Sequence, residues 1–294
     1  MKSLMKSFLF GVLLFGQVVF AETQPKEIRI GFIPAGDREM LKKGAFELAK
    51  ELQSAIGIPV TVYITKNYSG MIGALKEKKV DFSFLTSSVF VLAEKETQLK
   101  VLLKKVWAEP YYYSLIISKK DSKIQKFEDL KNKKIAFVDQ KSTSGYLYPL
   151  AMMKKRNLND SFFKEIKFSG SHSQSVNLLE SGEVDAIAIF GDDAKGENSA
   201  WKKYVKNKGN EKNYRVVWFS EPIPNDPFCV RQEFYDQNPK LVHNLMFSLI
   251  DVVEKLKTKK EVSEFIGANG FLPATSKQYD PVREMMKHLK LGVD

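Results

Sequence analysis

The sequence predicts an α/β protein made of two lobes, each a mostly parallel sheet flanked by helices, with a hinge between them. Short β-branched segments alternate with segments whose apolar residues follow helical spacing, and this alternation occurs in two successive blocks. A mostly helical segment then ends the chain. Such alternation is typical of parallel sheets covered by helices, and 294 residues suffice for two domains or for one domain divided into two lobes.

The first block begins with a strand at residues 28–33 and a helix at 38–54, which places Leu41, Leu48 and Leu52 on one face. Further strands are expected at 60–64, 80–85, 101–103 and 112–118, and further helices at 69–78 and from Ser87 onward. Strands and helices therefore alternate along the whole block.

The second block repeats this alternation after a short helical turn at 127–130. The segment at 184–189 is almost continuously apolar, as strands covered on both faces are. The other expected strands are 135–138, 166–168 and 214–219, and the expected helices are 142–156, 173–181, one near Trp201, 239–256, 262–266 and 281–289.

The chain is expected to cross between the lobes near residues 118–119 and again near 220–224, where Pro222 and Pro224 interrupt regular structure. The predicted division is a signal peptide at 1–21, a discontinuous first lobe at 22–118 plus 225–294, and a second lobe at 119–224.

The N-terminus predicts export. Lys2 and Lys6 precede an apolar run at 8–20, and small residues at Val19 and Ala21 fit a signal-peptidase site. We therefore expect cleavage after Ala21 and a periplasmic protein. The alternative is a membrane anchor, but the run is shorter than the roughly 20 residues that span a bilayer.

The composition argues against several functional classes. The formal net charge is +11, but acids lie between the lysines, which indicates a solvated surface and no nucleic-acid partner. A weaker interpretation is that the charge steers anionic ligands. Cys229 is the only cysteine and the chain has 3 histidines, so neither an internal disulfide nor a metal site is expected.

Enzyme motifs are also missing from the sequence. It lacks a nucleophile elbow, a phosphate-binding P-loop and a paired-histidine zinc motif. No nucleophile is recognisable beside an orienting base. We therefore expect no catalytic residues and no cofactor, and an exported hydrolase or transferase is a disfavoured alternative.

The strongest candidate for chemistry is a cluster of hydroxyl residues. Ser142, Thr143 and Ser144 follow a strand and precede a helix, with Gly145 next to them. The start of a helix exposes free N–H groups with a partial positive charge, and hydroxyl donors add to it, so this segment is suited to hold an anion. Glycine allows close approach of the backbone. The alternative is that these hydroxyls only cap the helix.

Other candidates lie at similar positions between strands and helices. His172 can donate to an oxyanion and changes its charge near neutral pH, unless it is only a packing residue. Asp192 or Asp193 can accept a hydrogen bond from a ligand, or can be a solvated loop acid. Tyr68 and one or two of the tyrosines at 111–113 can clamp a small polar ligand.

These motifs together resemble one known family, the PhnD-like phosphate, phosphite and phosphonate substrate-binding proteins of ABC transporters. The resemblance covers nearly all of the chain after residue 21. Its residues are Ile30-Gly31-Phe32-Ile33-Pro34, Tyr68, Val80-Asp81-Phe82, Tyr113-Ser114, Phe127-Glu128-Asp129-Leu130-Lys131-Asn132-Lys133-Lys134-Ile135-Ala136-Phe137, Ser142-Thr143-Ser144-Gly145, Gly170-Ser171-His172, Gly182-Glu183-Val184-Asp185-Ala186 and Ile223-Pro224-Asn225-Asp226-Pro227-Phe228.

The resemblance implies a type II periplasmic binding fold whose lobes close on a small oxyanion for delivery to a membrane ABC permease. It implies that Ser142, Thr143 and Ser144 bind the phosphonate group. It also implies that Tyr68 and His172 join them and that an acid near Asp193 contacts the ligand, and we add Tyr113. We expect a monomer.

The sequence departs from the family at one wall of this site. Many members have Gly-Pro and an aromatic residue after the strand at 80–85, whereas this chain has hydroxyl residues at 86–88, followed by Val89 and Phe90. We therefore expect Ser87 to approach the ligand from the first lobe. The departure leaves open another small anion or organic metabolite as the ligand, or an extracytoplasmic sensor on the same scaffold.

Overall fold

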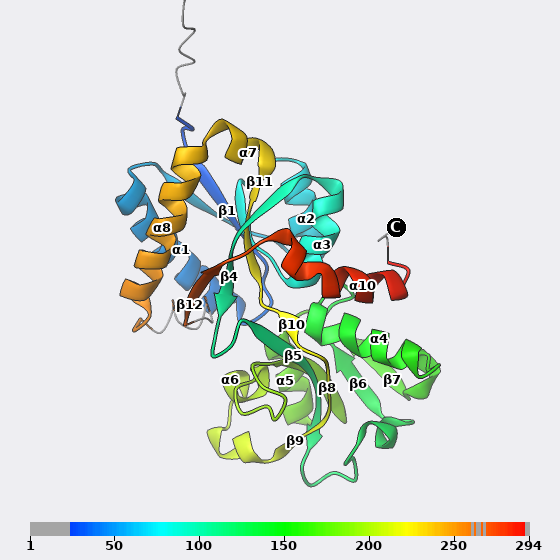
Figure 1. Cartoon of the computed structure of the whole chain (residues 1–294). Helices are drawn as coiled ribbons and strands as arrows, with labels where there is room; N and C mark the ends of the chain where they lie inside the picture. The colour runs from blue at the N-terminus through cyan, green and yellow to red at the C-terminus, as the bar shows by residue number, and fades with distance from the viewer. Residues whose placement is uncertain (1–23, 260–261, 263–265, 267–268, 292–294) are drawn as a thin grey trace, which may run out of the picture.

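The computed structural model describes residues 24–259, 262, 266 and 269–291 (Figure 1). The predicted signal peptide at 1–21 lies outside the described residues, as do residues 263–265 of the helix expected at 262–266. Among the residues described, no helix has the length and apolar character needed to cross a membrane.

The first lobe is built on a six-stranded sheet that draws strands from both ends of the chain. The strand order is β12 (Gly270–Pro273), β4 (Leu99–Val106), β11 (Pro227–Arg231), β3 (Phe82–Phe84), β1 (Ile28–Phe32) and β2 (Val60–Ile64). β1 pairs in parallel with both β2 and β3, whereas β11 pairs antiparallel with β3 and β4. The chain therefore returns to the first sheet after passing through the second.

Helices cover this first sheet with amphipathic faces. They are α1 (Arg38–Ile56), α2 (Tyr68–Lys76), α3 (Ser87–Glu96), α7 (Gln232–Gln237) and α8 (Pro239–Leu256). α1 and α8 contact each other on one side of the sheet, where Leu48, Leu52 and Leu249 join one core with Phe82 (Figure 1). The leucine spacing recognised in the sequence is therefore the buried face of α1.

The second lobe contains another six-stranded sheet. Its order is β10 (Ile223–Pro224), β5 (Tyr111–Lys119), β8 (Ala186–Gly191), β6 (Lys134–Phe137) and β7 (Glu165–Phe168), with β9 (Tyr214–Phe219) also paired to β5. The apolar segment at 184–189 supplies most of β8, which is buried in the middle of this sheet.

The helices around this second sheet are short. They are the π-helix η2 (Thr143–Leu147), α4 (Tyr148–Lys155), α5 (His172–Ser181) and α6 (Ala200–Tyr204), with 3-10 turns at Phe127–Leu130, Asp160–Phe162 and Lys208–Lys212. Near the end of the chain, the 3-10 turn Ser276–Tyr279 leads into α10 (Asp280–His288), which contacts both α3 and α4 (Figure 1). This last helix therefore links the two lobes.

One expected boundary is wrong. The first crossing was placed near residues 118–119, but β5 pairs with β10, β8 and β9 and so belongs to the second sheet. The chain therefore crosses earlier, at 107–110, between β4 and β5. It returns at 225–226, between β10 and β11. A strand pattern does not reveal which of two sheets the strand joins, because that depends on its partners.

Candidate ligand-binding site

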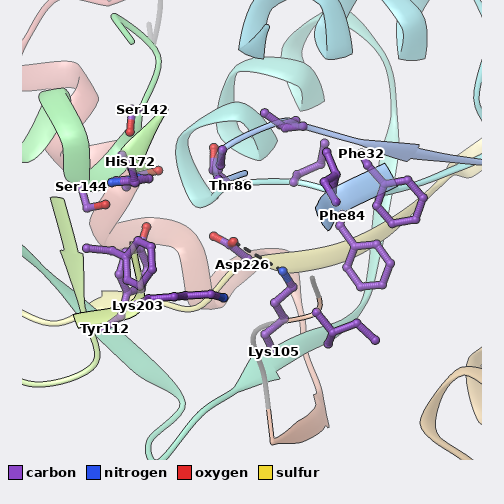
Figure 2. A pocket seen from close by; sticks show the side chains of 18 of the residues that line it. Phe32, Phe84, Thr86, Lys105, Tyr112, Ser142, Ser144, His172, Lys203 and Asp226 are labelled. Carbon is purple, nitrogen blue, oxygen red and sulfur yellow. Dashed lines mark ion pairs between the residues drawn. The ribbon is translucent and has the colours of Figure 1, made fainter. Parts of the chain in front are cut away.

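A cavity of about 340 Å³ lies between the two lobes (Figure 2). Its volume is about ten times the roughly 30 Å³ that one water occupies in the liquid. The first lobe lines it with Phe32, Ile33, Ala35, Gly36, Asp37, Met40, Leu41, Phe84, Leu85, Thr86, Lys105 and Ile266. The crossings supply Trp107 and Asp226, and the second lobe supplies Tyr112, Ser142, Thr143, Ser144, His172, Phe190, Lys203 and Tyr204.

The hydroxyl cluster predicted from the sequence lies at this cavity. Ser142, Thr143 and Ser144 follow β6, are at most 3% exposed, and lead into η2, which continues directly into α4. Ser142 is the N-cap and its Oγ accepts a hydrogen bond of 3.1 Å from the N–H of Gly145. The first N–H groups of a helix have no partners within it, so this start presents donors together with the hydroxyls.

Gly145 is required by close packing. A Cβ atom at this position would lie 2.5 Å from Cγ2 of Val138 and 2.7 Å from Oγ of Ser142. Only glycine fits between the end of the strand and the capping serine. The glycine recognised beside the hydroxyls therefore serves to fold the segment tightly.

The hydroxyl groups of this segment have different partners. Thr143 Oγ1 accepts from the N–H of Ser88 at 3.0 Å and donates to Ser88 Oγ at 2.8 Å, so it ties the start of α3 to the second lobe. The carbonyl of Ser144 accepts from Ser114 Oγ at 2.6 Å. The side chain of Ser144 lies near those of Ser142 and His172 (Figure 2). Ser142, Thr143 and Ser144 therefore all line the cavity, and the Thr143 hydroxyl is already bonded to Ser88.

His172 joins the cluster from the start of α5. It is 5% exposed, its N–H donates to the carbonyl of Ala35 in the first lobe at 2.9 Å, and its ring contacts Phe190 edge-on. Its buried Nδ1 atom has no hydrogen-bond partner among the described residues. Burial lowers the pKa of His172 to about 3, so the free protein holds it neutral near pH 7. The expected change of charge near neutral pH is therefore wrong for the free protein.

Tyr68 lies behind the cavity wall and is not among the lining residues. It begins α2 and is 1% exposed. Its hydroxyl has no hydrogen-bond partner among the described residues. Burial raises the pKa of Tyr68, and the nearby Ser142 hydroxyl offsets part of this rise, so Tyr68 is a protonated donor.

Ser87 and Asp193 take structural positions and do not line the cavity. Ser87 Oγ donates to the carbonyl of Pro224 at 2.6 Å. The carboxylate of Asp193 accepts hydrogen bonds from the N–H groups of Lys195, Glu197 and Asn198 and so holds its own loop.

Asp192 does not line the cavity either, although its buried Oδ1 has no partner among the described residues. Burial raises the pKa of Asp192 to about 6, with Asp193 adding to this shift and Lys203 opposing it.

Tyr112 lines the cavity, and Tyr113 does not. Alternate residues of a strand point to opposite faces, so only one of these two neighbours can face the ligand. Tyr112 is 4% exposed, and burial raises the pKa of its hydroxyl, which therefore stays protonated. Tyr113 packs with the core of the second lobe.

The sequence analysis missed the four charged residues that line the cavity, Asp37, Lys105, Lys203 and Asp226. Lys105 Nζ lies 4.0 Å from Asp226 Oδ2 and 5.4 Å from the centre of the Phe84 ring (Figure 2). Burial raises the pKa of Asp226 to about 6, although Lys105 opposes this shift. Lys105 was interpreted as one of many solvated lysines. The available signal was Asp226 itself, an acid placed beside Pro227 just after the crossing predicted at 220–224.

Two hinged α/β lobes, with helix starts and hydroxyl groups facing a cavity between them, define a substrate-binding protein of the periplasmic class. The chain belongs to the family described as the periplasmic substrate-binding protein of phosphonate ABC transporters, whose sequence model matches residues 30–279. This is a family of transport proteins and not of enzymes, as the sequence indicated.

Similar proteins agree with this assignment. The chain is 24% identical to a probable ABC transporter phosphite-binding protein, PhnD1, of Prochlorococcus marinus, over 96% of this chain and 95% of that one. It is 26% identical to the phosphonates-binding periplasmic protein of Escherichia coli, over 90% and 77% of the two chains. The solved structure of PhnD1 in complex with methylphosphonate matches 91% of this chain and 100% of that one, with a TM-score of 0.77 and 22% identity.

Proposed function

We propose that this protein captures a phosphonate-type oxyanion in the cavity between its lobes and presents it to a membrane ABC permease. The observation that carries the proposal is a cluster of buried donors at one end of the cavity. It consists of the hydroxyls of Ser142 and Ser144, the helix start that they open, and the Nδ1 of His172, which has no partner within the described part of the chain. Tyr68, whose hydroxyl likewise has no partner there, stands behind Ser142.

These donors suit a tetrahedral anion because hydrogen bonds to a charged oxygen are stronger than those between neutral groups. Each contributes about 1.5–3 kcal/mol. Several such bonds support micromolar or tighter binding after the ordering costs of association. Because His172 is neutral, it offers the anion a ring N–H donor and adds no positive charge to the site.

Hydrogen bonds between the lobes support a closed form of the protein as the form that delivers the ligand. The N–H of His172 donates to Ala35 across the cleft, and Thr143 bonds Ser88. Closure of this kind excludes water and gives the permease a shape to recognise. We further propose that the signal peptide is cleaved after Ala21 and that the protein acts in the periplasm as a monomer.

Calorimetry on the purified protein tests the proposal. The panel contains methylphosphonate, 2-aminoethylphosphonate, phosphite, phosphate and sulfate. We expect the phosphorus oxyanions to bind in preference to sulfate. A ligand at 100 times its Kd stabilises the protein by about 2.7 kcal/mol, which also raises the Tm. If none of these compounds gives heat or moves the Tm, the phosphonate assignment fails.

A further inference from the structure

A carboxylate shares the cavity with the proposed oxyanion site. Figure 2 shows Asp226 between the donor cluster (Ser142, Ser144 and His172) and Lys105, with its carboxylate toward the cluster. Asp226 and Lys105 form an ion pair in which Oδ2 lies 4.0 Å from Nζ, and both side chains are mostly buried. An anion held by the donor cluster therefore meets a buried negative charge on its other side.

The carboxylate of Asp226 has unused capacity to accept hydrogen bonds. Its distance from Lys105 is too long for a hydrogen bond, and no other described residue donates to its carboxylate oxygens. The other carboxylate of the lining is different, because Asp37 accepts a hydrogen bond of 2.8 Å from the N–H of Met40. An ionised carboxylate can only accept hydrogen bonds. The partner that Asp226 lacks is therefore a group that carries a proton.

Oxyanions of phosphorus and of sulfur differ in whether they carry such a proton. A phosphonate or phosphate loses its second proton only near neutral pH, so its singly protonated form has a P–OH donor beside its charged oxygens. A sulfonate has already lost its only acidic proton, and all its oxygens are acceptors. Acceptor oxygens placed against an ionised carboxylate meet repulsion between like charges. Asp226 can therefore distinguish two anions of the same shape.

We propose that Asp226 selects phosphorus oxyanions over sulfonates and sulfate by accepting a hydrogen bond from the remaining proton of the ligand. This inference rests on the proposed function and assigns the residue responsible for its specificity. In the complex one proton lies between the Asp226 carboxylate and a ligand oxygen, and Lys105 compensates the negative charge that remains on the carboxylate. A ligand that brings no proton binds only if Asp226 takes up a proton from water.

The groups packed around Asp226 leave it as a carboxylate that titrates within the cavity. Burial raises the pKa of Asp226 to about 6, although Lys105 opposes this shift. Burial lowers the pKa of Lys105, and Asp226 opposes that shift in turn. Burial also raises the pKa of three neighbouring hydroxyls, which stay protonated: those of Tyr68, Tyr112 and Tyr279. The other charged or titratable groups of the lining are Asp37, His172, Lys203 and Tyr204.

Methylphosphonate and methanesulfonate have the same shape and test this selection on the wild-type protein. Calorimetry at pH 6 and pH 8 measures both affinities. The methanesulfonate affinity is expected to fall about 50-fold from pH 6 to pH 8, because Asp226 must be protonated before this ligand binds. The methylphosphonate affinity is expected to change less than about threefold, because this ligand supplies the proton itself.

The two profiles separate the inference from the proposed function. If both affinities depend on pH in the same way, Asp226 does not select between the two anions, although phosphonate binding stands. If methylphosphonate binds at neither pH, the proposed function fails and the inference falls with it.

Substitution of Asp226 tests the residue itself. Asp226→Asn keeps the shape of the side chain but replaces the carboxylate by an amide, which can donate to a sulfonate. The methanesulfonate affinity at pH 8 is expected to rise at least tenfold and to lose its dependence on pH. Asp192→Asn is the matched control, because burial raises the pKa of Asp192 to about 6 as well but Asp192 does not line the cavity. This control is expected to keep the wild-type pH dependence.

The Tm and the binding of methylphosphonate show whether Asp226→Asn is folded. A folded variant that still binds methanesulfonate at pH 8 as weakly as the wild-type protein overturns the inference. Loss of the pH dependence in Asp192→Asn also overturns it, because the titrating group would then lie outside the cavity.

Discussion

Substitution of Ser144 can distinguish the contribution of its hydroxyl to ligand binding from the contribution of the residue to folding. Its carbonyl accepts a hydrogen bond from Ser114, whereas its side chain lies at the cavity. Ser144→Ala keeps the first contact and removes one donor to the ligand. We expect the affinity for a phosphonate to fall about 10- to 150-fold, which corresponds to about 1.5–3 kcal/mol, while the Tm of the free protein stays the same.

Titration calorimetry and thermal unfolding measure these two quantities. Ser181→Ala is the control, because this exposed serine donates to Leu178 far from the cavity lining. If Ser144→Ala lowers the Tm but leaves the phosphonate affinity unchanged, the role of Ser144 is purely structural.

His172 gives the free protein a stability that depends on pH. Its folded pKa of about 3 lies below the ordinary value of 6.5. Between these values the unfolded chain binds a proton that the folded protein does not, so the stability falls as the pH falls. From pH 6.5 to 4.5 the wild-type protein is expected to lose about 2.3 kcal/mol more unfolding free energy than His172→Gln.

Urea unfolding at both pH values measures this difference. Asp192 and Asp226, whose pKa values are raised to about 6, act in the opposite direction, because the folded protein takes up their protons first. Their effect is common to both proteins and cancels in the comparison. Parallel pH profiles of the two proteins would show that His172 is not buried as the structure describes.

At the scale of elements, the turn between β6 and α4 depends on Gly145. A Cβ there meets Val138 and the Ser142 hydroxyl, both of which are fixed by burial. Gly145→Ala is expected to lower the free energy of unfolding by about 1–3 kcal/mol. It also displaces the Ser142 hydroxyl, so the ligand affinity falls as well. Denaturant unfolding and calorimetry test both effects.

Gly73 provides the control for this substitution. It lies within α2, and no heavy atom comes within 4 Å of the position of an added Cβ. Alanine is favoured over glycine in a helix, so Gly73→Ala is expected to stabilise the protein by about 0.5–1 kcal/mol. Similar results for both substitutions would contradict the packing argument for Gly145.

The sequence predicted these elements best where local pattern decides the structure. The helix start at Ser142 to Ser144 depends on neighbouring residues, and its position followed from the hydroxyl and glycine pattern. The pairing of Lys105 with Asp226 joins residues far apart in the chain, so no local pattern reveals it. The same reason explains why β5 was placed in the wrong sheet.

Strand alternation also decides which tyrosine faces the cavity. The tyrosines at 111–113 were recognised as candidates, and Tyr113 was added to the predicted site. The structure places Tyr112 at the cavity instead. The side of the sheet on which Tyr112 lies is set by the pairing of β5 with β8 and β9, and this pairing could not be predicted from the sequence alone.

At the scale of the whole molecule, Asn225 joins the two segments that connect the lobes. Its Nδ2 donates to the carbonyl of Glu109 at 2.9 Å, and Tyr279 Oη donates to its carbonyl at 2.8 Å. Asn225 is 0% exposed and joins the crossings through this side chain and through a 3.4 Å bond from its backbone N–H to the carbonyl of Pro110. The relative orientation of the lobes, and with it the geometry of the cavity, depends on this contact.

Asn225→Ala removes the bond to Glu109 and leaves every cavity-lining residue in place. We expect the free energy of unfolding to fall by about 1 kcal/mol. We also expect the phosphonate affinity to fall about 3- to 10-fold, because lobes with a looser connection must be ordered when the ligand binds. Denaturant unfolding, calorimetry and small-angle X-ray scattering of the free protein measure the three quantities.

Asn213→Ala is the matched control, because the side-chain amide of this exposed asparagine donates to its near neighbour Asn210 and lies away from both crossings. A hinge role predicts that Asn225→Ala broadens the scattering of the free protein and that saturating ligand restores the wild-type profile. A variant that loses stability but keeps both the scattering profile and the affinity would show that Asn225 stabilises the fold without orienting the lobes.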